Sequence, residues 1–268
     1  MLRFSLPLSG SSRNYKDRNS TPSTTEESTL SPPGVKHSFT SELETRTYLK
    51  NHSVLRIESR SILHTNGTMS TSKRDRNVPP GVLNESRRTL TNENTGERIV
   101  FKKYAYEADD NGRDAVATIV CQPGGGPPLH YHKSYAERFE AIDGDLGVML
   151  NGKKLLLRPG DKADIPIGSV HRFFNNGDKD ITFMGSVVPG HPGFEKGLYI
   201  LFGLNNDGLA DPKTGMPYNI LHIALIGEMS DMRFAGFQGT LMNYLTGFLA
   251  AYARWRGVEE ELLKKYWD

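Results

Sequence analysis

The chain has 268 residues with a formal net charge of +2, and 24% of them are charged while 37% are hydrophobic. This composition is typical of a globular protein and is too polar for a protein with several membrane-spanning helices. A single cysteine, Cys121, excludes a disulfide framework and the multi-cysteine zinc and iron–sulfur sites. Residues 1–78 hold 12 basic and 7 acidic residues, and the remainder holds 21 and 24, so the body of the chain lacks the basic excess of a nucleic-acid-binding protein.

Residues 1–78 are predicted to be a disordered N-terminal extension. Of these residues, 25 are serine or threonine, and apolar residues occur singly or in short groups. Such a segment cannot bury enough apolar surface to offset the entropy lost on ordering. The residues before Asp17 contain arginine and serine but no acid, as in an organellar transit peptide, although a plain extension of a cytoplasmic protein is the simpler interpretation. Translation could start at Met1 or at Met69.

Residues 79–192 are predicted to form a β-barrel domain. Short β-favouring runs, such as residues 99–101 and 115–121, are separated by turn sequences. The turn signals recur roughly every 8–12 residues, which is typical of an antiparallel sandwich or barrel. The pairs Asn111-Gly112 and Asn151-Gly152 are strong signals for hairpin turns. We therefore expect a mainly β fold in this region.

Residues 193–268 are predicted to form an α-helical extension with helices at 194–204, 219–232, 240–255 and 258–266. In the third helix, apolar side chains at helical spacing form one stripe: Leu241, Tyr244, Leu245, Phe248, Leu249 and Tyr252. Residues 234–253 carry no charge, but their glycines, polar residues and one-sided hydrophobicity argue against a membrane span. We expect this helix to pack on the barrel or to form a subunit interface, and the extension to cover an open barrel face or to pair two subunits as a homodimer.

Three histidines and one glutamate have the pattern of a metal site. His130 and His132 are two residues apart, so in a strand both imidazoles lie on one face. Glu137 follows at an odd offset, and a turn over residues 133–135 would bring it onto the neighbouring strand, facing the histidines. His171 follows a second turn. A buried carboxylate without a partner is costly, and a divalent metal removes that cost.

These residues lie within two longer motifs. The first is Gly124-x5-His130-x-His132-x4-Glu137-x6-Gly144, and the second is Gly160-x5-Pro166-x-Gly168-x2-His171-x3-Asn175. With both motifs complete, the sequence resembles the cupin superfamily over about residues 101–188. The resemblance implies a small jelly-roll β-barrel whose interior holds a metal, with four ligands: His130, His132, Glu137 and His171.

The implied cofactor is one divalent transition metal, with iron or manganese favoured and nickel, zinc, copper or cobalt as alternatives. Four protein ligands on an octahedral ion leave two positions for an oxygenated substrate, water or dioxygen. The leading hypothesis is a dioxygenase-type oxidoreductase acting on a small oxygenated molecule. The alternatives are a non-oxidative isomerase or lyase that uses the metal as a Lewis acid, and a small-ligand-binding protein without turnover.

No catalytic residue is predicted beyond the metal ligands. Phe139, Ala141 and Phe173 are predicted to give a substrate pocket an apolar lining, and ordinary barrel packing is the alternative. The expected partner is a small-molecule substrate rather than a nucleic acid or a membrane.

Overall fold

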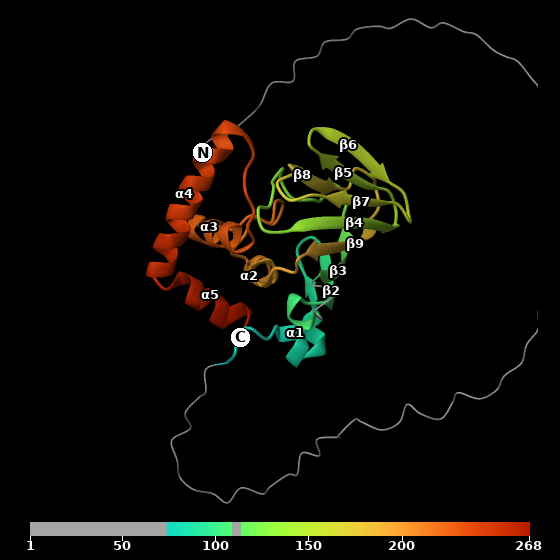
Figure 1. Cartoon of the computed structure of the whole chain (residues 1–268). Helices are drawn as coiled ribbons and strands as arrows, with labels where there is room; N and C mark the ends of the chain where they lie inside the picture. Colours follow the sequence, from blue (N-terminus) through green and yellow to red (C-terminus); the bar gives the residue numbers. More distant parts are fainter. Residues whose placement is uncertain (1–73, 109–113) are drawn as a thin grey trace, which may run out of the picture. The chain divides into compact units, whose positions relative to one another are not determined.

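The computed structural model describes residues 74–108 and 114–268 (Figure 1). Most of the predicted disordered extension, with Met1 and Met69, lies outside the described residues, as does the predicted hairpin turn at Asn111-Gly112. Nine strands are described: β1 (Thr89–Thr91), β2 (Arg98–Lys103), β3 (Ala115–Cys121), β4 (Ala136–Asp143), β5 (Leu146–Leu150), β6 (Lys153–Leu157), β7 (Lys162–Ile165), β8 (His171–Phe174) and β9 (Ile181–Val188). The mainly β fold predicted for residues 79–192 is therefore confirmed.

The strands form two antiparallel sheets. The larger has the order β1-β2-β3-β9-β4-β7, and the smaller has the order β6-β5-β8. The core between them draws on both sheets: Cys121, Phe139, Ala141, Leu146, Val148, Leu157, Ala163, Ile165, Ile181 and Phe183. Strand alternation sends every second side chain into this interior, as expected for the jelly roll implied by the sequence motifs.

The turn at Asn151-Gly152 is a confirmed hairpin. It joins β5 to β6, which pair in antiparallel register from Leu150 and Lys153 outward. Asn151 and Gly152 have φ angles of 48° and 80°, and asparagine and glycine tolerate this left-handed backbone better than other residues. A tight two-residue turn of this kind determines the register of the smaller sheet.

The C-terminal part of the chain is helical, as predicted. The long helices are α2 (Pro192–Asn206), α3 (Ile220–Met229), α4 (Gly236–Trp255) and α5 (Val258–Tyr266). Two short helical segments, α1 (Pro80–Leu83) and a 3-10 turn at Glu85–Arg88, precede β1, and a further 3-10 turn, Ala105–Glu107, follows β2. The helices lie together beside the larger sheet (Figure 1).

A second hydrophobic core joins the helices to strand β2. Ile99 and Phe101 of β2 belong to it, and the Phe101 ring stacks on Tyr199 of α2 with centroids 5.9 Å apart. The indole of Trp267, directly after α5, meets the same Tyr199 ring edge-on at 5.1 Å. The division into a barrel domain (79–192) and a helical extension (193–268) stays a prediction, but the two regions share this core.

The described N-terminal residues pack against the C-terminus. Arg76 donates hydrogen bonds to the Asp268 carboxylate at 2.7–3.1 Å and also pairs with Glu260. The Trp267 indole donates to the Arg76 carbonyl oxygen at 3.1 Å. Residues near 76, which the sequence assigned to the tail, therefore contact the helical region.

Helix α2 buries an unusual carboxyl group near its start. The Glu195 side chain is fully buried, and its Oε1 accepts a hydrogen bond from the Ala105 N–H at 2.7 Å. Its Oε2 has no hydrogen-bond partner among the described residues. Burial raises the pKa of Glu195 from 4.5 to about 7, because the charged form loses its hydration without gaining a cation.

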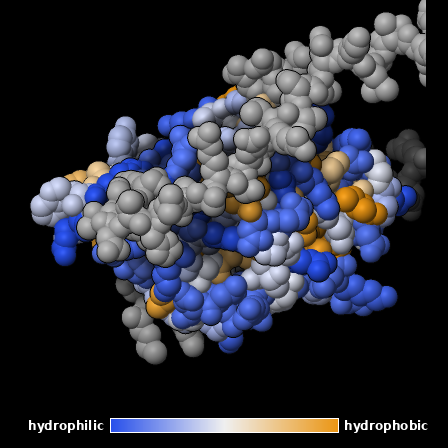
Figure 2. Space-filling model, turned by 90° about the horizontal axis from the view of Figure 1, so that it is seen from below, coloured by the Kyte–Doolittle hydropathy of each residue, from blue (hydrophilic) through white to orange (hydrophobic). Residues whose placement is uncertain are grey.

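The apolar stripe predicted on α4 does not face the barrel. Leu241, Tyr244 and Phe248 are 68%, 76% and 70% exposed, so the expectation that this face packs on the barrel is wrong. Across the described residues, no helix combines the length and hydropathy that a membrane crossing requires. On the face of the molecule shown in Figure 2, hydrophilic residues predominate and hydrophobic residues form small separate groups.

Candidate metal centre

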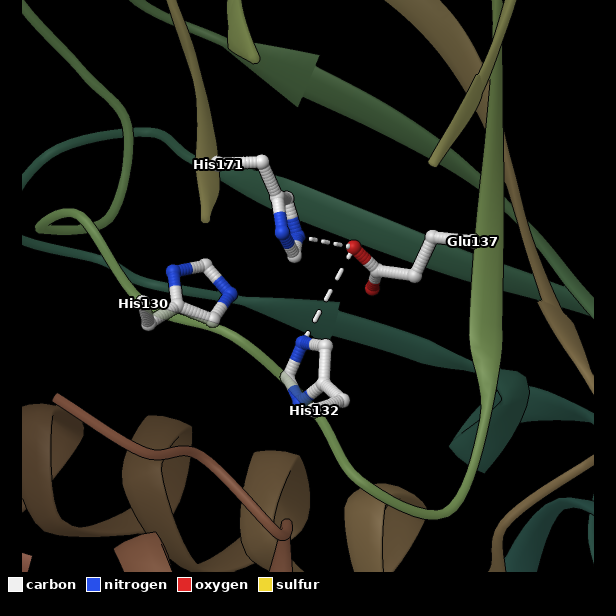
Figure 3. Close-up of side chains that lie close together, drawn as sticks. All are labelled: His130, His132, Glu137 and His171. Carbon is white, nitrogen blue, oxygen red and sulfur yellow. Dashed lines mark hydrogen bonds and ion pairs between the residues drawn. The ribbon is translucent and has the colours of Figure 1, made fainter. Parts of the chain in front are cut away.

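The four predicted ligands converge at one point, with Glu137 on the larger sheet and His171 on the smaller one. Their ligand atoms all lie within 4.8 Å of one another (Figure 3). Glu137 comes from β4 and His171 begins β8, whereas His130 pairs with His171 through an isolated antiparallel bridge. The turn after His132 brings Glu137 to face the imidazoles, as its odd spacing in the sequence required.

Each histidine is oriented by a backbone carbonyl. The Nδ1 atoms of His130, His132 and His171 lie 2.8, 3.1 and 2.9 Å from the carbonyl oxygens of Pro128, Asp231 and Ser169. A carbonyl oxygen only accepts, so each Nδ1 carries a proton and donates it. In a neutral imidazole the lone pair is then on Nε2, the atom that faces the centre of the cluster. These hydrogen bonds to backbone carbonyls fix the orientation of each ring, as they do for histidines that bind metals.

The carboxylate of Glu137 supplies the negative charge within this group of imidazoles. Burial would disfavour its charge, but the His171 hydrogen bond and the nearby imidazoles outweigh burial and lower the pKa of Glu137. His171 Nε2 lies 2.7 Å from Glu137 Oε2, and although burial opposes charge on His171, this contact raises its pKa. Burial and the neighbouring imidazoles lower the pKa of His130 to about 4, so it is neutral at physiological pH.

The residues fit a divalent metal ion. His132 Nε2 is buried, lies 3.9 Å from Glu137 Oε2, and has no hydrogen-bond partner among the described residues. An orphaned buried nitrogen is costly unless something fills the position that it faces. A metal would satisfy this nitrogen and would take the place of the proton between His171 and Glu137. Nitrogen and oxygen donors together suit a first-row transition metal.

The loop between α3 and α4 holds the segment that carries the first two histidines. Tyr131 and Arg233 exchange two backbone hydrogen bonds, at 2.9 and 3.0 Å. The Asp231 carboxylate accepts from the N–H groups of Lys133 and Ser134, at 2.7 and 2.8 Å, and from the Ser134 hydroxyl at 2.7 Å. Because the Asp231 carbonyl also accepts from His132, one residue fixes both a predicted metal ligand and the turn that follows it.

The backbone conformation and the ionised side chain of Asp231 both suit this role. It has a φ of 50°, a left-handed conformation that aspartate adopts more readily than most residues. Burial alone would raise the pKa of Asp231, but hydrogen bonds from Ser134, Lys133 and Arg233 outweigh it and lower the pKa. The carboxylate therefore stays ionised and keeps its strong acceptor capacity.

Sequence reasoning missed Asp231 and the contact between Tyr135 and His132. Tyr135 is fully buried, its ring stacks on His132 with centroids 4.2 Å apart, and its hydroxyl donates to the Ser230 carbonyl at 2.8 Å. No local signal links Asp231 to His132, because the two residues lie 99 positions apart. The only hint was the turn-forming Ser230-Asp231 pair at the end of a predicted helix.

The three residues predicted to line a substrate pocket all lie in the barrel interior. Phe139 is 3% exposed, and its ring centroid is 6.2 Å from that of His171. Phe173 meets Phe139 edge-on at 5.8 Å, and Ala141 belongs to the same core. The interior next to the histidines is therefore apolar, and a role for these residues in substrate binding stays a prediction.

Sheets, ligand set and motifs together define a cupin. Residues 117–187 match the family model described as "Cupin domain". This region of the chain is therefore a cupin domain.

Among curated proteins, the chain is 36% identical over 83 residues to quercetin 2,3-dioxygenase of Bacillus subtilis (strain 168), covering 29% of this chain and 25% of that protein. It is 47% identical over 49 residues to oxidoreductase OpS7 of Beauveria bassiana (strain ARSEF 2860), covering 18% of this chain and 16% of that protein. The chain thus spans a quarter or less of the length of these two relatives. A solved cupin-superfamily sugar phosphate isomerase from Silicibacter pomeroyi is 25% identical, with a TM-score of 0.30, over 34% of this chain and 59% of that one.

Proposed function

We propose that this protein is a metal-dependent oxidoreductase of the dioxygenase type that acts on a small oxygenated molecule. The observation that carries the proposal is the buried Nε2 of His132, which has no hydrogen-bond partner among the described residues and faces Glu137 and two further imidazoles. Relatives named as a quercetin dioxygenase, an oxidoreductase and an epoxidase support oxidative chemistry at this site.

His130, His132, Glu137 and His171 would hold the metal. A redox-active divalent ion such as iron or manganese would supply, when bound, Lewis-acid polarisation of a substrate oxygen and a path for electrons from that substrate to dioxygen.

The protein's own contribution is orientation and exclusion of water. The carbonyls of Pro128, Asp231 and Ser169 keep the three imidazoles in one tautomer, with Nε2 toward the centre. Glu137 supplies one negative charge, which partly offsets the charge of a divalent cation. Phe139 and Phe173 give the adjoining interior an apolar wall, which favours an aromatic or otherwise apolar body in the substrate and keeps water away from it.

The test is metal content by elemental mass spectrometry on the full chain, followed by oxygen-uptake assays with aromatic and dicarbonyl compounds. Alanine substitutions at His130, His132 and His171 should each lower occupancy from about one equivalent to a small fraction, since each removes a ligand. The control is His222→Ala, because His222 lies in α3 outside the cluster. Full occupancy in all three ligand variants would refute the metal site. A metal-loaded protein that consumes no oxygen yet converts such compounds would point instead to isomerase or lyase chemistry.

A further inference from the structure

Helix α4 carries a long apolar surface that no described part of the chain covers. Seven residues form what we call the α4 stripe: Phe237, Leu241, Tyr244, Leu245, Phe248, Tyr252 and Trp255. At about 100° per residue, their side chains fall within one sector about 100° wide along the whole helix. The exposed fraction is 92% for Phe237, 68% for Leu241, 76% for Tyr244, 44% for Leu245, 70% for Phe248, 38% for Tyr252 and 78% for Trp255.

The opposite face of α4 attaches it to the rest of the protein through small residues. Gly239, Ala250 and Ala253 are buried there, and the Asn243 side chain bonds the backbone N–H and carbonyl of Phe234 at 2.9 Å each. Helix α3 lies between α4 and the strands (Figure 1). A helix normally turns its largest apolar side chains toward the core, and α4 does the reverse. The stripe therefore needs a cover from outside the described chain.

The area of the stripe is that of a stable protein interface. Aromatic side chains present on the order of 200 Å² each, so at the exposed fractions above the five aromatic residues alone offer about 700 Å². The two leucines add to this. A standard protein–protein interface buries about 800 Å² per partner, whereas the largest apolar patch of a typical monomer is about 300–600 Å².

We propose that the α4 stripe is the interface of a homodimer in which two α4 helices pack antiparallel about a two-fold axis. A two-fold axis places one patch against its own copy, and an uncharged stripe that runs the length of a 20-residue helix matches itself in this way. Such a seam would be about 30 Å long. The pairing leaves no aromatic stripe exposed to water.

The charges next to the stripe favour a second copy over a lipid surface. Helix α5 follows α4 directly and begins with Glu259, Glu260 and Glu261. Interfacial membrane helices are usually rich in lysine and arginine, whereas α4 carries one basic residue, Arg254, which Glu259 neutralises at 2.6 Å. In an antiparallel dimer the two α5 helices lie at opposite ends of the seam, so their like charges stay far apart.

The first experiment measures the mass of the full chain by light scattering across micromolar concentrations. We expect about 60 kDa, twice the chain mass of 29.9 kDa. Phe248→Glu should weaken dimerisation at least 100-fold and give a folded monomer, since the side chain is exposed within one chain. The matched control is Leu156→Glu, which changes a similarly exposed apolar residue on β6 and should stay dimeric.

A cysteine pair tests the antiparallel geometry. Leu245 lies near the middle of α4, so Leu245→Cys should form a disulfide-linked dimer under mild oxidation. Two copies of Phe237→Cys would sit about 25 Å apart along the seam, far beyond the reach of a disulfide. Native Cys121 is buried and should not react.

Five results would overturn the proposal. One is a wild-type chain that stays monomeric at 100 µM. A second is a Phe248→Glu variant that dimerises as tightly as the wild type. Another is a monomer that binds phosphatidylserine–phosphatidylcholine vesicles through the stripe, or one that dimerises only when residues 1–73 are removed, which would make the tail the cover. A dimer in which Phe237→Cys crosslinks as readily as Leu245→Cys would overturn the antiparallel arrangement.

Discussion

Replacing Asp231 with alanine should loosen the metal centre without touching a ligand. The substitution removes three hydrogen bonds to the 133–134 segment, at 2.7–2.8 Å, and one from Arg233 at 3.1 Å. A hydrogen bond to a charged group contributes about 1.5–3 kcal/mol, but Lys133 and Ser134 are exposed, so water can replace part of the loss. Adding the strain of alanine at a φ of 50°, we expect the free energy of unfolding to fall by about 3 kcal/mol.

The effect on metal affinity follows from the position of the same residue. The Asp231 carbonyl orients His132, and its carboxylate holds the turn that leads from His132 to Glu137. Loss of such outer hydrogen bonds typically costs 10–100-fold in metal affinity, and we expect a loss in this range. The assay is a titration of the full chain with Co²⁺, followed by visible absorption, which reports both affinity and ligand geometry.

Two further variants separate positioning from general stability. Asp231→Asn should recover much of the affinity, because asparagine tolerates the left-handed backbone and keeps one acceptor oxygen. Asp211→Ala is the matched control, since Asp211 also accepts two backbone N–H groups, at 2.8 and 3.0 Å, in a loop that holds no ligand. An Asp231→Ala protein that is destabilised yet binds Co²⁺ as tightly as the wild type, with an unchanged spectrum, would refute the reasoning.

Two other predictions concern stability. Because the pKa of Glu195 is raised from 4.5 to about 7, the folded state between these pH values holds a proton that the unfolded state has lost. The free energy of unfolding should therefore fall by about 3 kcal/mol as pH rises from about 4.5 to 7. Chemical denaturation at several pH values should show that Glu195→Gln removes this fall; an unchanged slope would contradict it. Glu107→Gln is the control of opposite sign, since the Arg88 hydrogen bond lowers the pKa of Glu107 and its stabilisation is lost as pH falls. In thermal melts Gly126→Ala should lower the free energy of unfolding by about 3 kcal/mol, because a Cβ would lie 2.2 Å from the Phe173 carbonyl oxygen. A Cβ at Gly124 meets no atom within 4 Å, so Gly124→Ala should cost only about 1 kcal/mol, from backbone strain. Equal losses in these two variants would show that the clash is relieved by movement.

Local patterns in the sequence were enough for much of the fold. The Asn151-Gly152 turn and the helix near residues 240–255 follow from short-range rules, because turn chemistry and helical periodicity act over a few residues. The spacing of His130, His132, Glu137 and His171 also indicated their convergence, since strand alternation and two turns leave few other arrangements. The resemblance to cupins rested on the same positions.

Only the tertiary structure decided what surrounds those residues. His132 depends on Asp231, which comes from a helix–helix loop 99 residues away, and nothing in either local sequence records that contact. The α4 stripe is a second case. Periodicity shows that its large side chains share one face, but the direction of that face depends on the small residues Gly239, Ala250 and Ala253, which pack on the opposite side. The sequence by itself determined which elements form and which predicted ligands meet, because those depend on near neighbours along the chain. The support of the ligands and the exposure of the stripe depend on distant packing, which only the folded chain reveals.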